Sequence, residues 1–220
     1  MTNLLKKEKS PYLKQHENNP VDWHAWNAES LKKAKELKKP IFLSVGYASC
    51  HWCHVMAHES FESIETAKVM NEKFINIKVD REERPDLDIV FQKSLAILTG
   101  TPGGWPLSMF LDENGVPFSG GTYFPPKEMY GRPDFVKVLN NVSDVYKNNR
   151  EKIINQAPQI KTVFEDLNKK SSVINQNLQP YVEQILKYLD PDYGGFEGSP
   201  KFPQFYVFDC LFYYFKKNSK

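Results

Sequence analysis

Two cysteines three residues apart, Cys50 and Cys53, are the residues whose type and spacing most clearly indicate chemistry. They enclose His51 and Trp52, and His54 follows them directly. Such a pair can exchange a disulfide with a partner, bind a metal ion or anchor a haem. Because each chemistry needs a different structural setting, the elements around the pair decide between the three.

A thiolate at the start of a helix would favour disulfide exchange. The apolar run Ile41–Gly46 predicts a strand buried on both faces, and a helical pattern begins at His51. Cys50 would then lie at the helix N-terminus, where free N–H groups and the helix dipole stabilise a thiolate. We therefore expect Cys50 to attack and the more buried Cys53 to resolve the mixed disulfide, while a partly protonated His51 favours the Cys50 thiolate. Trp52 is too bulky for a neutral spacer and should form a contact surface beside the sulfurs.

The elements predicted along the chain follow the order β-α-β-α-β-β-α after an N-terminal extension. The extension contains an irregular arm over 10–26 and a helix over 27–39. The strands and helices that follow are expected at 41–46, 51–71, 74–79, 86–98, 107–111, 116–120 and 133–167. Asn114-Gly115 predicts a hairpin turn, and Pro158 predicts a break in the last helix. Parallel strands joined by helices, then an antiparallel hairpin and a covering helix, form the α/β fold of thioredoxin, a central mixed sheet flanked by helices.

Trp105-Pro106 is the second candidate part of the site. Pro106 directly precedes the strand predicted over 107–111, where thioredoxin-like folds carry a cis-proline opposite the cysteines. The position supports this prediction, because only about 5–6% of X–Pro bonds in folded proteins are cis. We expect Gly104, Trp105 and Pro106 to hold the backbone of a substrate beside the sulfurs.

Zinc is the alternative chemistry for the same residues. Cys50, Cys53, His54 and His58 are nitrogen or sulfur donors within nine residues, and such donors suit Zn²⁺. They crowd into little more than two turns, whereas zinc sites usually draw ligands from two separated pairs. Haem attachment would need export and a second axial ligand, and the strand before the pair does not suit it. We therefore expect a redox-active disulfide and no cofactor, with zinc as the alternative.

Other reactive or charged residues have simpler interpretations. Cys210 lies in an intensely aromatic stretch and is expected to be a small buried apolar residue. His58 is expected to be a surface histidine without a catalytic role. The charged run over 80–86 should form a strand-to-helix loop with local ion pairs that contribute little if exposed.

The composition limits the partners. The net charge is +2 with mixed signs, whereas nucleic-acid-binding proteins usually carry a clustered basic face. The apolar runs are shorter than the roughly 20 residues of a membrane-spanning helix, and no signal peptide is recognisable. Three cysteines do not make a structural disulfide framework. We expect a cytoplasmic protein whose partners are protein or small-molecule thiols and disulfides, without nucleic acid or membrane.

Three motifs together resemble a known family: Cys50-His51-Trp52-Cys53-His54, the run Val-Asp-Arg-Glu-Glu-Arg-Pro-Asp over 79–86, and Gly-Gly-Trp-Pro-Leu over 103–107. The chain resembles the N-terminal thioredoxin-like domain of the spermatogenesis-associated protein 20 family, which has bacterial and archaeal members. The resemblance implies a longer protein with a C-terminal helical domain similar to sugar epimerases. We expect residues 1–168 to form the thioredoxin-like domain, and 169–220 a linker and the truncated start of a toroid-like helical domain.

Two positions depart from ordinary thioredoxins. Ser44 stands where they carry a buried Asp six residues before the first cysteine, and His51-Trp52 replaces their Gly-Pro spacer. These departures argue for a narrower substrate or for a sensor. Two functions stay open: a thiol–disulfide oxidoreductase of unknown substrate, and a non-enzymatic module, responsive to redox state or zinc, that regulates a C-terminal helical domain.

Overall fold

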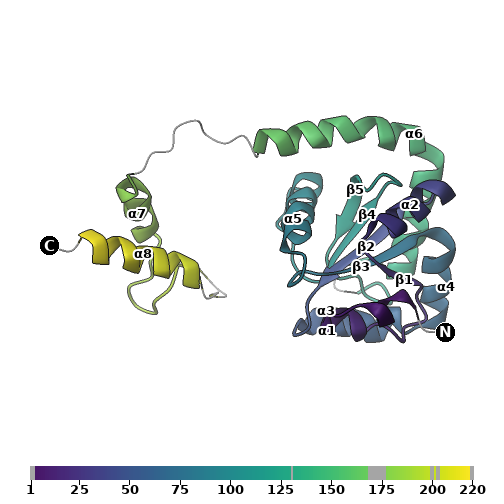
Figure 1. Ribbon diagram of the computed structural model, residues 1–220, viewed down its shortest axis with the longest axis horizontal. Helices are drawn as coiled ribbons and strands as arrows, with labels where there is room; N and C mark the ends of the chain where they lie inside the picture. The colour runs from purple at the N-terminus through teal and green to yellow at the C-terminus, as the bar shows by residue number, and fades with distance from the viewer. Residues whose placement is uncertain (1–2, 130, 168–176, 199–200, 202–203, 219–220) are drawn as a thin grey trace. The chain divides into compact units, whose positions relative to one another are not determined.

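The computed structural model describes residues 3–129, 131–167, 177–198, 201 and 204–218. The chain divides into two compact units, Met1–Glu165 and Asp166–Lys220. Figure 1 shows that the first unit contains the sheet and the second contains helices α7 and α8. No helix among the described residues is long and apolar enough to span a membrane.

A mixed five-stranded sheet forms the centre of the first unit. Its strands are β1 (Trp23–Ala25), β2 (Ile41–Gly46), β3 (Ile75–Asp80), β4 (Leu107–Leu111) and β5 (Pro117–Gly121). They lie in the order β1-β3-β2-β4-β5. β3 pairs in parallel with β1 and β2, and β4 pairs antiparallel with β2 and β5. This is the thioredoxin-like α/β fold, so the predicted fold class is confirmed.

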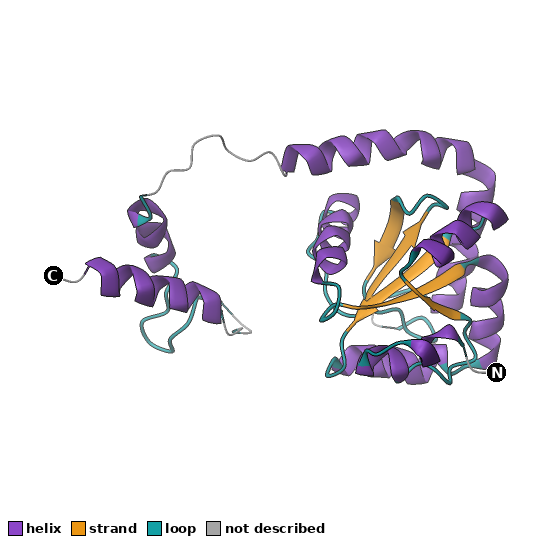
Figure 2. Ribbon diagram, viewed as in Figure 1, coloured by secondary structure: helices purple, strands orange, loops and turns teal. Residues whose placement is uncertain are grey.

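Helices cover both faces of this sheet (Figure 2). One core contains residues of α1 (Pro11–Lys14), α3 (His51–Met56), α4 (Ile64–Lys73) and the start of α6 (Phe135–Leu167). The other core contains residues of α2 (Ala28–Leu37) and α5 (Pro85–Thr99). Successive strand residues point to opposite faces, so β2 and β4 each contribute to both cores.

The two faces of β2 and β3 differ in polarity. Ile41, Leu43 and Val45 point into the core against α2 and α5. The alternating residues on the other face include Ser44, with Lys78 as its partner on β3, and both side chains are buried. The polar residues therefore lie under the helix that begins after Cys50.

The hairpin and the central strands follow the prediction closely. β2 and β4 have the predicted bounds, and β5 begins one residue later than expected. Gly115 has a φ of +85°, which glycine adopts without strain, whereas Asn114 keeps a negative φ. The turn therefore depends on Gly115 alone rather than on both residues.

Two of the predictions for the chain before β3 are wrong. The irregular arm predicted over 10–26 contains α1 and the edge strand β1, whose three residues are too few to produce a strand pattern. The single helix predicted over 51–71 is divided, because the π-helical turn η2 (Ala57–Phe61) ends it and Ser63 caps a new helix, α4. The Ser63 side chain accepts a hydrogen bond from the Thr66 N–H, which is the usual start of a helix.

The last helix of the first unit bends earlier than predicted. Asn149 has non-helical backbone angles inside α6, whereas the backbone at Pro158 is assigned to the helix. The Asn149 amide donates to the Val145 carbonyl, so its side chain takes part in local backbone hydrogen bonding at the bend. The prediction of a break at Pro158 is therefore wrong.

The second unit contains α7 (Gln179–Leu186) and α8 (Phe205–Asn218). Leu211 of α8 is buried, but Cys210 beside it is exposed, so the prediction of a buried Cys210 is wrong. The sequence showed how apolar α8 is, but did not show which of its faces the second unit covers. Most of the predicted linker lies outside the described residues, and the toroid-like domain stays a prediction.

Candidate functional site

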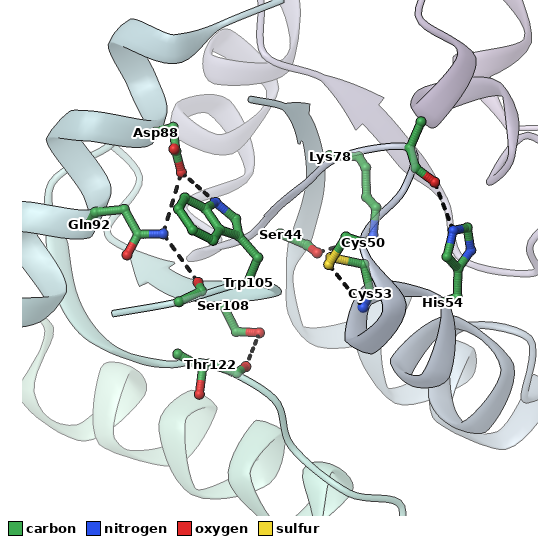
Figure 3. Close-up of a disulfide and its surroundings, with 12 residues drawn as sticks. Ser44, Cys50, Cys53, His54, Lys78, Asp88, Gln92, Trp105, Ser108 and Thr122 are labelled. Carbon is green, nitrogen blue, oxygen red and sulfur yellow. Dashed lines mark hydrogen bonds between the residues drawn. A yellow bond between two sulfur atoms is a disulfide. The ribbon is translucent and has the colours of Figure 1, made fainter. Parts of the chain in front are cut away.

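Cys50 and Cys53 are joined by a disulfide at the start of α3, with their Cα atoms 5.3 Å apart. Cys50 is the N-cap of α3, and its sulfur accepts the Cys53 N–H at 3.2 Å. Figure 3 shows this contact beside Ser44 and Lys78. The helix N-terminus therefore presents a donor to the Cys50 sulfur, which stabilises a thiolate there.

Both cysteines are more enclosed than the sequence suggested. Cys53, 1% exposed, is the more buried of the two as expected, but Cys50 is also buried, at 3% exposed. The loop before them positions Cys50, whose N–H donates to the Tyr47 carbonyl at 3.1 Å. A partner must therefore approach the Cys50 sulfur closely, past the side chains around it.

Trp52 forms part of an aromatic wall on the open side of the disulfide. Its side chain is 51% exposed, and its ring lies 5.1 Å from that of Tyr123. The two rings line a pocket of about 370 Å³ together with Gly104, Trp105 and Arg132. His51 is exposed, and its ring lies 5.6 Å from Trp52. The pocket offers aromatic surface, exposed backbone and one cation beside the cysteine motif.

The Trp105-Pro106 peptide bond is cis, and Pro106 is buried directly before β4. The Trp105 indole N–H donates to Asp88 at 2.9 Å (Figure 3). The Gly104 carbonyl accepts the Gln92 amide at 3.1 Å. Two side chains of α5 therefore hold the segment that carries the proline. Sequence reasoning did not assign a role to Asp88 or Gln92.

Arg81 also contacts this segment. Its guanidinium carbon lies 4.1 Å from the centre of the Trp105 ring, and its Nε lies 3.6 Å from an Asp88 oxygen. The local ion pair predicted for the charged run is present between Arg84 and Asp86. Arg81, however, stacks on Trp105 and so belongs to the site, which its position in a charged loop did not reveal.

A buried amine lies among the aromatic rings of the core that also contains the two cysteines. Lys78 is 1% exposed, and its Nζ donates to the Ser44 hydroxyl at 3.1 Å. The same Nζ lies 4.3 Å from the centre of the Phe61 ring and 4.8 Å from that of Trp23. Burial lowers the pKa of Lys78 well below its ordinary value of 10.5, which favours the neutral amine. Because Ser44 stands where ordinary thioredoxins carry an acid, Lys78 pairs with a hydroxyl here. It has no carboxylate partner among the described residues.

Tyr12 is a second buried polar residue near the cysteines that the sequence did not single out. It lies in α1, which begins where Ser10 accepts the Leu13 N–H and Pro11 takes the first helical position. Burial raises the pKa of Tyr12 above its ordinary value, and the nearby charge of Asp80 raises it further. The Ser-Pro pair could have revealed the helix, but no local pattern indicates that its tyrosine reaches the sheet.

The histidines of the zinc alternative have other partners. His54 Nε2 lies 2.8 Å from the Ala48 carbonyl, and His58 Nδ1 lies 3.0 Å from Glu62 at the surface. His58 is exposed, which confirms its interpretation as a surface histidine. Within the described part of the chain, no group of three or more His, Cys, Asp or Glu residues could hold a metal ion.

Comparison with known proteins places the chain in a family. A family model described as "Thioredox_DsbH: Protein of unknown function, DUF255" matches residues 2–165. The chain is 42% identical to spermatogenesis-associated protein 20 of Rattus norvegicus, over 96% of this chain and 28% of that protein. It is 44% identical to the uncharacterized protein B0495.5 of Caenorhabditis elegans, over 95% of this chain and 29% of that protein.

The chain therefore spans less than a third of the length of these curated relatives. A solved structure described as DsbH oxidoreductase is similar with a TM-score of 0.43 at 20% identity, over 58% of this chain and 85% of that one. The family model and the similarity to spermatogenesis-associated protein 20 agree with the resemblance seen in the motifs. The chain belongs to the family described as Thioredox_DsbH, protein of unknown function.

Proposed function

We propose that the chain is a thiol–disulfide oxidoreductase in which Cys50 attacks and Cys53 resolves. The observation that supports this most is the Cys50–Cys53 disulfide at the N-terminus of α3, where the Cys50 sulfur accepts a backbone N–H. A helix N-terminus stabilises the thiolate, which is the reactive form of cysteine. The aromatic pocket beside the motif gives a partner a surface on which to dock.

In the reducing direction, the Cys50 thiolate attacks one sulfur of the partner's disulfide. A bond forms between Cys50 and that sulfur, and the second partner sulfur leaves as a thiolate that takes up a proton. Cys53 then attacks the Cys50 sulfur, the Cys50–Cys53 disulfide forms, and the first partner sulfur is released as a thiol. Two electrons pass from the cysteine pair to the partner. An oxidising reaction follows the same steps in reverse.

The open side of the site suggests a polypeptide partner. Trp52, Trp105 and Tyr123 offer aromatic surface, and the Gly104 segment offers backbone next to the cis-proline. His51 is exposed beside the Cys50 end of the helix, where its protonated form would favour the thiolate. We propose a reducing cytoplasm as the compartment, in which protein and small-molecule thiols supply or remove the electrons.

The decisive experiment compares Cys50→Ser with Cys210→Ser in insulin reduction and in exchange with glutathione. Cys50→Ser should lower the rate to that without protein, because serine cannot form a disulfide. Cys210→Ser is the matched control, since Cys210 is an exposed free thiol in the second unit. If Cys50→Ser retains the rate of the unaltered chain, this function is wrong.

Cys53→Ser tests the division of roles between the two cysteines. Without a resolving thiol, the mixed disulfide between Cys50 and a partner should persist and be visible by mass spectrometry under non-reducing conditions. A mixed disulfide that accumulates on Cys53 in the Cys50→Ser variant instead would reverse the assigned roles.

A regulatory module is the second candidate, which the exposed aromatic side chains of α8, such as Phe205, Tyr206 and Phe212, favour. In that case the cysteine pair would respond to redox state or to zinc and act on a helical domain of a longer chain. Metal analysis of the reduced protein purified without oxygen separates the zinc version. Stoichiometric zinc that is lost in Cys53→Ala would support it, and a metal-free reduced protein would contradict it.

A further inference from the structure

The resolving thiol lacks the acid that ordinary thioredoxins place near it. Cys53 is 1% exposed, and Ser44 occupies the position of that acid. Burial in apolar surroundings disfavours a thiolate, so the resolving step needs a polar group inside the protein. Such a group must reach the Cys53 sulfur and must have hydrogen-bonding capacity to spare.

The Tyr12 hydroxyl reaches the space beside the Cys53 sulfur. A Cβ built on Gly46 would lie 2.2 Å from the Tyr12 oxygen and 2.7 Å from the Cys53 sulfur. Both atoms therefore border the same small space, which stays open because residue 46 is glycine. The hydroxyl comes from α1 of the N-terminal extension, and the sulfur comes from α3.

The Tyr12 hydroxyl can also donate a hydrogen bond that it does not make elsewhere. Its oxygen is buried and has no hydrogen-bond partner among the described residues. The disulfide sulfur next to it is a weak acceptor, whereas a thiolate accepts strong, charge-assisted hydrogen bonds. The hydroxyl is thus unsatisfied in the oxidised state and gains a good acceptor when the pair is reduced.

Most of the other polar groups that face Tyr12 already have partners. The Asp80 carboxylate accepts the Ser10 hydroxyl at 2.6 Å and the Glu82 N–H at 2.8 Å. His16, whose ring lies 5.1 Å from that of Tyr12, uses its Nδ1 on Asn19, while its Nε2 has no hydrogen-bond partner among the described residues. Lys78, whose Nζ lies 5.3 Å from the Tyr12 ring centre, donates to Ser44.

From this geometry we propose that the Tyr12 hydroxyl donates a hydrogen bond to the Cys53 sulfur in the reduced protein and stabilises the thiolate that resolves the mixed disulfide. The inference rests on the proposed oxidoreductase function and adds a residue to it. In the step, Cys53 bonds to Cys50 as the bond from Cys50 to the partner breaks, and the partner sulfur takes the electron pair. The proton of Cys53 ends on the released thiol, while Tyr12 keeps its own.

The test measures the equilibrium of Tyr12→Phe with glutathione redox buffers at neutral pH, with the oxidised fraction read by alkylation and mass spectrometry. Phenylalanine removes the donor and the buried unsatisfied oxygen, so the disulfide should become more stable than in the unaltered chain. We expect the ratio of oxidised to reduced protein to rise about tenfold at a given buffer, since a hydrogen bond to a charged group is of that size. Tenfold corresponds to a reduction potential lower by about 30 mV.

Two further variants separate this role from a general effect on packing. Tyr146→Phe is the matched control, because Tyr146 is a buried tyrosine whose hydroxyl donates to Glu113 in a different part of the unit. It should lose stability without moving the equilibrium. Site-specific 3-fluorotyrosine at position 12 keeps the ring and strengthens the donor, so it should shift the equilibrium in the opposite direction to Tyr12→Phe. It also provides the measurement if Tyr12→Phe does not fold.

A pH profile of alkylation gives a second readout. In the Cys50→Ser background, Tyr12→Phe should raise the pH at which Cys53 becomes reactive. An equilibrium and a profile that are both unchanged by Tyr12→Phe would overturn the role of Tyr12. If the unaltered chain exchanges with glutathione and this variant behaves identically, only the proposed role of Tyr12 is ruled out. If the unaltered chain does not exchange at all, the oxidoreductase function fails instead.

Discussion

The two sides of the disulfide are built differently. The open side carries Trp52, Trp105 and Tyr123 around a pocket, with Trp52 51% exposed. The closed side carries Tyr12 and Lys78, both buried against the helices that cover the sheet. Figure 3 shows Trp105 to the left of the two cysteines and Lys78 above them. Groups that a partner could contact are thus separated from groups that could set the properties of the sulfurs.

This separation indicates which side should control partner binding and which should control stability and the redox equilibrium. Exposed aromatic residues can change how well a partner binds, but they are screened by solvent and contribute little to folding. Buried polar groups act through a medium of low dielectric constant, so they strongly affect the pKa and stability of whatever they face. Substitutions on the closed side should alter stability and redox equilibrium, and those on the open side should alter partner binding.

The largest expected effect comes from a methyl group added where the closed side is tightest. Gly46→Ala would place a Cβ 2.2 Å from the Tyr12 oxygen and 2.7 Å from the Cys53 sulfur. We expect a loss of about 3 kcal/mol in the free energy of unfolding, as in overpacked cores, measured by urea denaturation. Gly104→Ala on the open side is the control, because its Cβ would meet only Thr122 at 3.7 Å. Equal losses in the two variants would contradict the comparison.

The next effect comes from removing the buried amine. Lys78 must lose its proton or its hydration on folding, because burial lowers its pKa. Lys78→Met should therefore raise the free energy of unfolding, by about 2 kcal/mol if it behaves like other buried ionisable groups that are replaced by apolar residues. Urea denaturation at pH 7 measures this.

The same substitution should also change how the free energy of unfolding depends on pH. The unfolded chain binds a proton at Lys78 below pH 10.5 and the folded chain does so only at lower pH, so the unaltered protein gains stability as pH rises toward 10.5. In Lys78→Met, the part of the rise in the free energy of unfolding with pH that comes from this group should be absent between pH 7 and 9. A variant that is less stable and keeps the slope would show that Lys78 is charged and satisfied in the fold.

His16 gives a smaller effect at acidic pH. Burial is the largest cause that lowers the pKa of His16 from 6.5 to about 2. Between these values the unfolded chain binds a proton that the folded chain does not, so stability falls as the pH falls below 6.5. The loss should approach about 1.4 kcal/mol per pH unit.

His16→Gln should remove this part of the slope in urea denaturation between pH 7 and 5. His58→Gln is the control, because His58 is exposed and pairs with Glu62 at the surface. An unchanged slope in His16→Gln would mean that His16 takes up a proton inside the fold.

The smallest effect on stability is expected on the open side. Trp52→Ala should change the free energy of unfolding by about 0.5 kcal/mol or less, because half of the side chain is exposed. It should raise the KM for a peptide disulfide about tenfold, as the loss of an aromatic contact does at interfaces. The redox equilibrium with glutathione should stay as it is. A shifted equilibrium with an unchanged KM would reverse the roles of the two sides.

The sequence predicted the open side of the site better than the closed side. The cysteine spacing, the strand Ile41–Gly46 and the strand after Pro106 are local patterns, and each depends on a few adjacent residues. The edge strand over 23–25 was missed because it is defined by its pairing with β3 and not by its own residues. Local patterns thus located the motif but not all of its surroundings.

The closed side depends on contacts between distant segments. Lys78 alternates with apolar residues, which resembles a strand with one solvated face, but helices cover that face and bury the amine. Tyr12 meets Cys53 only because α1 folds back over the sheet at Gly46. Cys210 was assigned wrongly for the same reason, since burial in an apolar helix depends on what covers it.

The reduction potential of the Cys50–Cys53 pair is the best measure of whether this pair exchanges disulfides with a partner. The oxidised fraction would be measured by alkylation and mass spectrometry after equilibration in buffers of defined glutathione or dithiothreitol ratio. An exchanging pair should titrate reversibly between about −270 and −120 mV, the range of thioredoxin-like oxidoreductases. A pair that stays oxidised until below about −300 mV would be a structural disulfide, and the proposed exchange at Cys50 would be wrong.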